Sequence, residues 1–196
     1  MRKLFFRNWK YLNNIPPLPN ELTQLVIDHC KKNVLPLQQF SSNLGTESTT
    51  NTLGMSWEEA DNTMPNLARF HPVPITKELE VVNQWIKQNI SKKSKATLQV
   101  MPGPGNVPPH IDIGRKEVFN YLIDTGGDST ETVFYKVKPE FQYLFAEPGS
   151  VISYDRIYEV ERIILSSNQW HALNVQAIHG VKNISTQRIA ISVINI

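Results

Sequence analysis

The sequence predicts a mainly β domain with flanking helices, in which antiparallel strands form a sandwich or jelly roll and the helices lie on one sheet. Two amphipathic helical patterns occur in the first half of the chain, and none follows them. From residue 95 onward, short apolar segments succeed one another, separated by turns rich in glycine, proline and serine. Because no helical pattern lies between these segments, a doubly wound parallel sheet is disfavoured.

Length and composition indicate one domain of ordinary globular type. The chain has 196 residues, of which 40% are hydrophobic and 19% charged, and it is long enough to bury a core. We expect a single domain over residues 1–196, with helical support and a lid loop in 1–94 and the β core in 95–196. The net charge of +2 is too small to predict a nucleic-acid partner.

Nothing in the sequence has the composition of a targeting signal or a membrane span. The opening MRKLFF loses its apolar character at Arg7, and no later stretch approaches the roughly 20 apolar residues that a span requires. The single cysteine, Cys30, cannot form an internal disulfide and is typical of a buried, reduced thiol. We expect a cytoplasmic protein with no membrane partner, and the sequence predicts no oligomeric state.

Two helices are predicted before the strands begin. Asn20 is a favourable N-cap for NELTQLVIDHCKKN, whose apolar residues share one helical face. A second helix is predicted from Thr76, where TKELEVVNQWIKQNI repeats apolar residues at helical spacing. Between the helices, residues 41–66 form a long polar segment with Trp57 and Met64, and we expect this segment to act as a lid over a site.

The strands are predicted from eight apolar segments bounded by turn sequences. They are ATLQVM, EVFNYLID, ETVFYKV, FQYLFA, SVISY, RIILSS, WHALNV and RIAISVINI, which begin at residues 96, 117, 131, 141, 150, 162, 170 and 188. In the last segment one face is wholly apolar, and the other carries Arg188, Ala190 and Ser192. We expect the apolar face to pack under the helices and the other face to line a cavity that holds an anion.

A histidine and an aspartate two residues apart, His110 and Asp112, stand where a loop rich in proline and glycine meets an apolar run. On a strand these side chains point the same way, and Ile111 and Ile113 point into the opposite layer. An imidazole and a carboxylate so placed supply two ligands of a two-histidine, one-carboxylate site, which leaves open positions on iron(II). The alternative is that the pair is only two polar residues at the edge of a strand, with no metal.

The second histidine of such a site has two candidates. His179 ends a short apolar run and is followed by a turn and by the strand of Arg188, so it is the preferred ligand. His171, at the start of another predicted strand, is the alternative. His29 falls on the first predicted helix and His71 in a loop, and we expect both to be structural or solvated.

The order His110-x-Asp112, then His179, then Arg188 resembles the Fe(II)- and 2-oxoglutarate-dependent dioxygenases, whose core is a double-stranded β-helix of jelly-roll or cupin-like type. The resemblance covers about residues 95–196, and within the family the small prolyl- or aspartyl/asparaginyl-hydroxylases, some of phage type, are the most similar. It implies that the catalytic iron ligands are His110, Asp112 and His179. It also implies that Arg188 binds the distal carboxylate of 2-oxoglutarate, with Ser192 as a helper.

The resemblance further implies the reaction. Members of the family use Fe(II), 2-oxoglutarate and O2 to hydroxylate a protein side chain, an amino acid or a small molecule, and they release succinate and CO2. This chain departs from the pattern in two places, since many members have glycine where it has Thr186 and some have serine where it has Ala190. These departures affect the assignment of the cosubstrate residues more than that of the metal ligands.

Other polar residues are candidates for the same cavity. Asn120 and Tyr135 lie in predicted strands and could bind the cosubstrate, and ordinary cross-strand roles are the alternative for both. Arg115 and Lys116 would border the mouth and meet an acidic group of an unidentified substrate, or else be solvated. Three other functions stay open: a cupin-like metal isomerase, a non-catalytic ligand-binding module of the same barrel, and an interaction protein without a metal.

Overall fold

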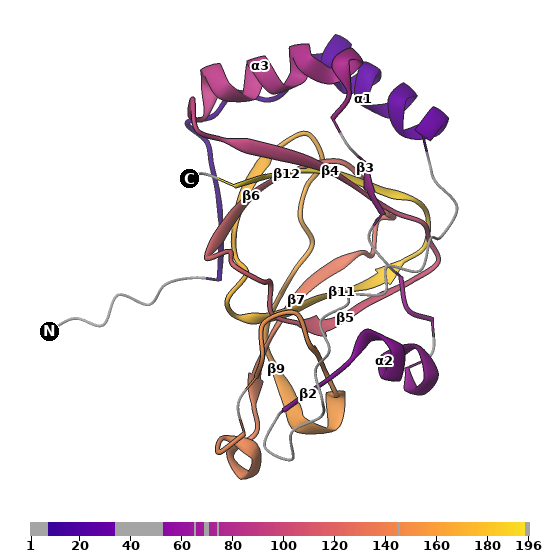
Figure 1. Cartoon of the computed structure of the whole chain (residues 1–196), viewed down its shortest axis with the longest axis vertical. Helices are drawn as coiled ribbons and strands as arrows, with labels where there is room; N and C mark the ends of the chain where they lie inside the picture. Colours follow the sequence, from indigo (N-terminus) through magenta and orange to yellow (C-terminus); the bar gives the residue numbers. More distant parts are fainter. Residues whose placement is uncertain are drawn as a thin grey trace, which may run out of the picture.

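The structure, a computed structural model, describes residues 8–33, 53–64, 66–68, 71–73, 75–144 and 146–194. Two antiparallel sheets face each other, and two helices cover the outer face of one of them (Figure 1). The predicted fold class is therefore confirmed: the chain is mainly β, with a double-stranded β-helix and helices packed on one sheet. Within the described ranges, no helix is long and apolar enough to cross a membrane.

Each sheet has six strands, and strands distant in sequence are neighbours in both. In the first sheet the spatial order is β1 (Trp9–Tyr11), β10 (Trp170–Asn174), β6 (Glu117–Thr125), β12 (Arg188–Ile194), β4 (Lys95–Met101) and β3 (His71–Val73). In the second sheet it is β2 (Gly54–Met55), β8 (Val151–Ile152), β5 (Gly105–His110), β11 (Ile178–Ile184), β7 (Glu131–Val137) and β9 (Ile157–Ile163). The strands β1, β2 and β3 thus join sheets that are built mainly from residues after 94.

The helices form where their apolar spacing predicted them. Helix α1 spans Asn20–Asn33, as predicted, and the second predicted helix begins as a 3₁₀ turn (Lys77–Leu79) that continues into α3 (Glu80–Asn89). A third helix, α2 (Trp57–Thr63), lies inside the expected lid segment and was not predicted as a helix.

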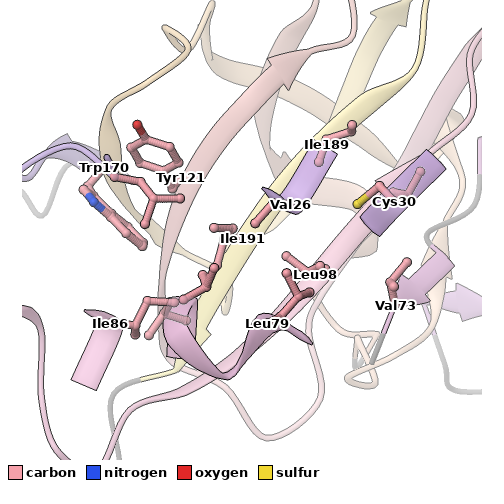
Figure 2. Packing of buried hydrophobic residues seen from close by; sticks show 14 of the residues in the cluster. Val26, Cys30, Val73, Leu79, Ile86, Leu98, Tyr121, Trp170, Ile189 and Ile191 are labelled. Carbon is pink, nitrogen blue, oxygen red and sulfur yellow. The ribbon is translucent and has the colours of Figure 1, made fainter. Parts of the chain in front are cut away.

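The larger core lies between these helices and the first sheet (Figure 2). Val26 and Cys30 of α1 and Ile86 of α3 pack against Ile189 and Ile191 of β12, and all five are almost fully buried. Burying an aliphatic side chain of this size stabilises the fold by about 1.5–3 kcal/mol. The apolar face of β12 therefore packs under the helices, as its alternating pattern predicted.

A second core fills the space between the two sheets, which we call the barrel interior. It contains Leu122 of β6, Phe134 of β7, Leu173 of β10 and Ala190 of β12, all buried. Because Ala190 belongs to this core, the face of β12 that carries Arg188, Ala190 and Ser192 is the interior face.

Five of the predicted strands are confirmed as β4, β6, β7, β10 and β12, and three predictions differ from the structure. The segment FQYLFA is wrong as a strand, because Pro139–Phe141 is a 3₁₀ turn and turns follow it. RIILSS is placed too late, since β9 ends at Ile163. SVISY is a strand only over Val151–Ile152, and a 3₁₀ turn (Tyr154–Arg156) follows.

Strand β5 was missed altogether, because its sequence GNVPPH reads as a loop. Proline cannot donate to a ladder, so Pro108 and Pro109 argue against a strand. In the structure, β5 pairs with β11 at Gly105, Val107 and His110, with register shifts between these pairs. The irregular pairing accommodates the prolines.

Candidate metal centre

Three potential metal ligands meet at one end of the second sheet. His110 is the last residue of β5, and it lies directly opposite His179, the second residue of β11. Asp112 follows β5, and its Oδ1 lies 3.4 Å from His110 Nε2 and 4.0 Å from His179 Nε2. One donor atom from each of the three side chains falls within 4.8 Å of the other two. The structure therefore brings together the three residues that the sequence singled out.

Backbone carbonyls orient both imidazoles. His110 Nδ1 lies 2.8 Å from the carbonyl oxygen of Pro108, and His179 Nδ1 lies 3.0 Å from that of Ala177. Because a carbonyl only accepts, each Nδ1 carries a proton, so Nε2, which is turned toward Asp112, is the nitrogen that can bind a metal. A histidine that ligates a metal ordinarily has its other ring nitrogen held in this way.

The close approach of the two histidine strands depends on Gly180. A Cβ at this position would lie 2.7 Å from the carbonyl oxygen of Val107 on β5, closer than van der Waals contact allows. The imidazole rings of His110 and His179 consequently stand with centroids only 4.4 Å apart. Glycine after His179 thus lets both rings share one centre.

Asp112 reaches the centre from a loop, which corrects the expectation that it extends the strand of His110. Strand β5 ends at His110, and the Asp112 N–H donates to the carbonyl of Val175 over 3.1 Å. Ile113 was expected in the opposite layer, but it is 55% exposed. Loop hydrogen bonding, and not strand alternation, aims the carboxylate at the two imidazoles.

The ionisation states suit a divalent cation. Burial raises the pKa of Asp112, but the hydrogen bond from His110 and the nearby His179 and Arg115 together hold it below its usual value. Burial and the neighbouring His110 lower the pKa of His179 to about 4, against the opposing effect of Asp112. At neutral pH the centre therefore offers an ionised carboxylate and an unprotonated His179, which are the forms that bind metals.

Two imidazoles and one carboxylate fit Fe(II) by their donor chemistry. Such a set would hold the ion on one side and leave positions open for other ligands. Iron(II) could therefore be held by His110, Asp112 and His179. These are the three residues that the sequence predicted as ligands.

The interior face of β12 carries a buried cation. Arg188 is 4% exposed and its Nη1 donates to the carbonyl of Thr125 over 2.8 Å, while its Nε has no hydrogen-bond partner among the described residues. Burial lowers the pKa of Arg188 to about 10, and Asp124 opposes this effect. The guanidinium stays charged at neutral pH and keeps unused hydrogen-bonding capacity, which suits an anionic ligand.

The other residues expected at the cosubstrate site divide between two faces. Ser192 is 1% exposed on the interior face of β12, directly opposite Asn120 of β6, whose buried Oδ1 has no partner in the described part of the chain. Tyr135 belongs instead to a cluster with Leu53 and Ile152, separate from the interior core of Phe134. The structure thus brings Asn120 and Ser192 together and places Tyr135 elsewhere.

The remaining histidines lie outside the metal group. His171 is on the interior face of β10, opposite Asn120, and it is not part of the cluster of three ligands. His29 is buried on α1 with Nδ1 3.5 Å from a Glu78 carboxylate oxygen, as expected of a structural residue. His71 lies in β3.

Part of the expected lid borders the metal centre, and residues 41–52 and 65 of it lie outside the described residues. Within it, β2 pairs with β8, and Ser56 and Glu59 form a capping box that starts α2. The first residue of α2 is Trp57, whose ring centroid lies 6.0 Å from that of His110 and whose indole N–H donates to the carbonyl of Gly149 over 3.2 Å. Trp57 therefore lies beside His110 at one side of the candidate metal centre.

The cations expected at the mouth differ in position. Arg115 Nη1 lies 3.8 Å from Asp112 Oδ2, and its side chain is 30% exposed. Lys116 is exposed, and its carbonyl accepts from the Val175 N–H. Arg115 is thus the one of the two that adjoins a metal-ligand candidate.

Comparisons of sequence find no relative, whereas comparisons of structure do. No protein-family model and no curated protein sequence matches the chain. The fold is similar to a prolyl hydroxylase from Trichoplax adhaerens, solved with a peptide fragment of the hypoxia-inducible factor oxygen degradation domain. The TM-score is 0.52 at 12% identity, over 96% of this chain and 83% of that one. A prolyl 4-hydroxylase from Pseudomonas putida matches with a TM-score of 0.47 at 9% identity, over 96% and 92% of the two chains.

Proposed function

We propose that this chain is an Fe(II)- and 2-oxoglutarate-dependent oxygenase that hydroxylates an unidentified substrate and releases succinate and CO2. The observation that carries the proposal is the convergence of His110, Asp112 and His179 within 4.8 Å at the end of a barrel whose interior holds a buried arginine. The similarity of fold to a prolyl hydroxylase supports it.

Each side chain has a definite task in this proposal. His110 and His179 bind the metal through Nε2, since their Nδ1 protons are held by Pro108 and Ala177. Asp112 binds through Oδ1, the oxygen turned toward both imidazoles. The carbonyl contacts hold this arrangement before the ion binds, which reduces the ordering that binding requires.

Arg188 binds the distal carboxylate of 2-oxoglutarate. Its Nε is free of other partners among the described residues, and the low-polarity surroundings strengthen an ion pair with a carboxylate. When bound, Fe(II) and 2-oxoglutarate supply the oxidising chemistry that consumes O2. The protein orients these groups and limits access of water, since both imidazoles are less than one-tenth exposed.

The test is succinate release from 2-oxoglutarate. Purified protein given Fe(II), ascorbate, O2 and 2-oxoglutarate should release succinate slowly even without its substrate, as measured by NMR or mass spectrometry. His179→Ala should abolish release, because two ligands hold the ion poorly. His29→Gln, a change of a buried histidine on α1, should retain it.

The result separates the candidate functions. A metal isomerase or a ligand-binding module of the same barrel would bind metal but consume no 2-oxoglutarate. Wild-type protein that takes up Fe(II) and forms no succinate, with or without candidate substrates, would therefore contradict the proposal.

A further inference from the structure

Unsatisfied polar atoms in the barrel interior point to a binding residue beyond those already described. Four buried side-chain atoms on the first sheet make no hydrogen bond within the described residues: Asn120 Oδ1, both ring nitrogens of His171, and Arg188 Nε. Buried polar groups nearly always have partners, so a group of four on adjoining strands calls for an explanation.

The strand register places His171, Asn120 and Ser192 in one polar row across three adjoining strands. His171 of β10 lies opposite Asn120 of β6, and Asn120 lies opposite Ser192 of β12. Arg188 is on the same face of β12 as Ser192 and is near enough to lower the pKa of His171. The ring of Tyr11 on β1 closes the other end of the row, 5.1 Å from that of His171.

His171 is fully buried and neutral. Burial, together with Arg188, lowers its pKa to about 4, and the Asn120 backbone opposes this effect from a position near the ring but outside hydrogen-bond geometry. At neutral pH the ring therefore has one N–H to donate and one nitrogen that accepts. Packing alone does not explain such a group, because leucine or phenylalanine would fill the space without burying two polar atoms.

We propose that His171, which has an N–H to donate, hydrogen-bonds the 2-oxo dicarboxylic acid that Arg188 anchors. This inference rests on the proposed function and adds a neutral donor from β10 to the cation from β12. A neutral imidazole beside Arg188 avoids repulsion between two cations when the interior holds no anion, and it still donates to an oxygen of the acid.

The experiment measures binding, not turnover. The full-length chain, loaded with Mn(II) without oxygen, is titrated with 2-oxoglutarate by calorimetry. His171→Leu should weaken 2-oxoglutarate binding about 10- to 100-fold, because it removes a hydrogen bond to a charged ligand. Manganese affinity should stay within about 3-fold. The melting temperature of the protein without 2-oxoglutarate should not fall, since the change removes an unsatisfied buried group.

Further variants distinguish a binding role from a structural one. His171→Gln, which keeps a donor and an acceptor, should recover most of the affinity. His29→Leu, a matched change of a buried histidine outside the barrel interior, should leave 2-oxoglutarate affinity unchanged. A His171→Leu protein that melts lower and binds 2-oxoglutarate like wild type would overturn the inference. Failure of both His171→Leu and His171→Phe to fold would also overturn it.

The inference and the proposed function fail in different ways. If wild-type protein binds Mn(II) but not 2-oxoglutarate, the proposed function is wrong. If wild type binds 2-oxoglutarate, Arg188→Met does not, and His171→Leu binds normally, only the role of His171 is wrong.

Discussion

The two oxygens of Asp112 have different neighbours. Oδ1 faces both imidazoles, and Oδ2 lies 3.8 Å from Arg115. The charge of Arg115 therefore acts on the oxygen that is turned away from the candidate metal position. This division favours coordination through a single oxygen, which keeps more positions on the ion open.

Gly180 permits a prediction about a single methyl group. Gly180→Ala would place a Cβ 2.7 Å from the Val107 carbonyl, so β5 must shift and the two histidines must separate. We expect metal affinity, measured by calorimetry, to fall by about 10-fold or more, as for a disturbed supporting contact. Val181→Ala on the same strand also costs stability but creates no clash, and it should keep metal affinity near that of wild type.

A change at Arg188 should affect binding of the cosubstrate but not binding of the metal. Arg188→Met keeps much of the side-chain length and removes the charge, so 2-oxoglutarate affinity should fall about 100-fold while Mn(II) affinity changes little. The melting temperature should hold or rise, because a buried cation is costly to desolvate. Arg162→Met, at an exposed arginine on β9, is the control. Equal loss of metal and 2-oxoglutarate binding would contradict this assignment.

At the scale of elements, β12 joins the helix layer to the barrel interior. Its alternate side chains pack under α1 and α3 on one side and carry Arg188 and Ser192 on the other. The helices therefore support the strand that carries the candidate cosubstrate residues, because they pack on its opposite face.

This arrangement predicts that stability and site chemistry can be separated on β12. Ile191 is fully buried under the helices, so Ile191→Ala should lower the free energy of unfolding by about 2–5 kcal/mol in urea denaturation. Below its melting transition, the variant should still bind metal with wild-type stoichiometry. Loss of metal binding by protein that remains folded would show that the two faces are coupled.

Helix α2 carries Trp57 to the metal centre, and its capping box stabilises its first turn. Ser56→Ala removes the acceptor for the Glu59 N–H, which costs about 1 kcal/mol. We expect faster hydrogen exchange at the α2 amides and altered Trp57 fluorescence, with little change in the global melting temperature. Unchanged exchange would mean that β2 pairing and the Gly149 contact hold α2 without the cap.

At the scale of the molecule, hydrogen bonds connect one edge strand of the first sheet with one edge strand of the second. The carboxylate of Glu161 on β9 accepts from Asn8 Nδ2 and from the Trp9 indole, each over 2.9 Å. These bonds join the edge strand β9 of the second sheet to the start of β1, the edge strand of the first. The barrel interior, with its polar row, is closed on that side.

The buried His171 also predicts how global stability depends on pH. Its folded pKa is about 4, below the usual value of about 6.5, so the unfolded chain binds a proton more readily. Stability should therefore fall as pH drops from 6.5 toward 4, and by pH 5 this residue should contribute a loss of roughly 2 kcal/mol.

Urea unfolding of wild type and His171→Leu at pH 7 and pH 5 measures this contribution. The difference between the two proteins cancels the other titrating groups, so His171→Leu should lose less stability on acidification. Equal losses would show that His171 is protonated to the same degree in the folded and unfolded chains.

Prediction from sequence failed where the backbone departed from regular patterns. The prolines of β5 suggested a loop, and only pairing with β11 shows it to be a strand. The segment FQYLFA has strand-like composition but follows Pro139 into a 3₁₀ turn. Short apolar runs of this kind do not distinguish strands from buried turns, because either can place hydrophobic side chains against a core.

The sequence by itself determined α1, the two faces of β12 and the order His110, Asp112, His179, Arg188, because each depends on spacing within a short segment. Only the tertiary structure decided how the Asp112 loop turns back, how closely Gly180 lets β11 approach β5, and that His171 lies opposite Asn120 within electrostatic reach of Arg188. These features depend on contacts between residues far apart in the chain. Local periodicity carries no information about such contacts, since side chains meet only where strands pair and sheets pack.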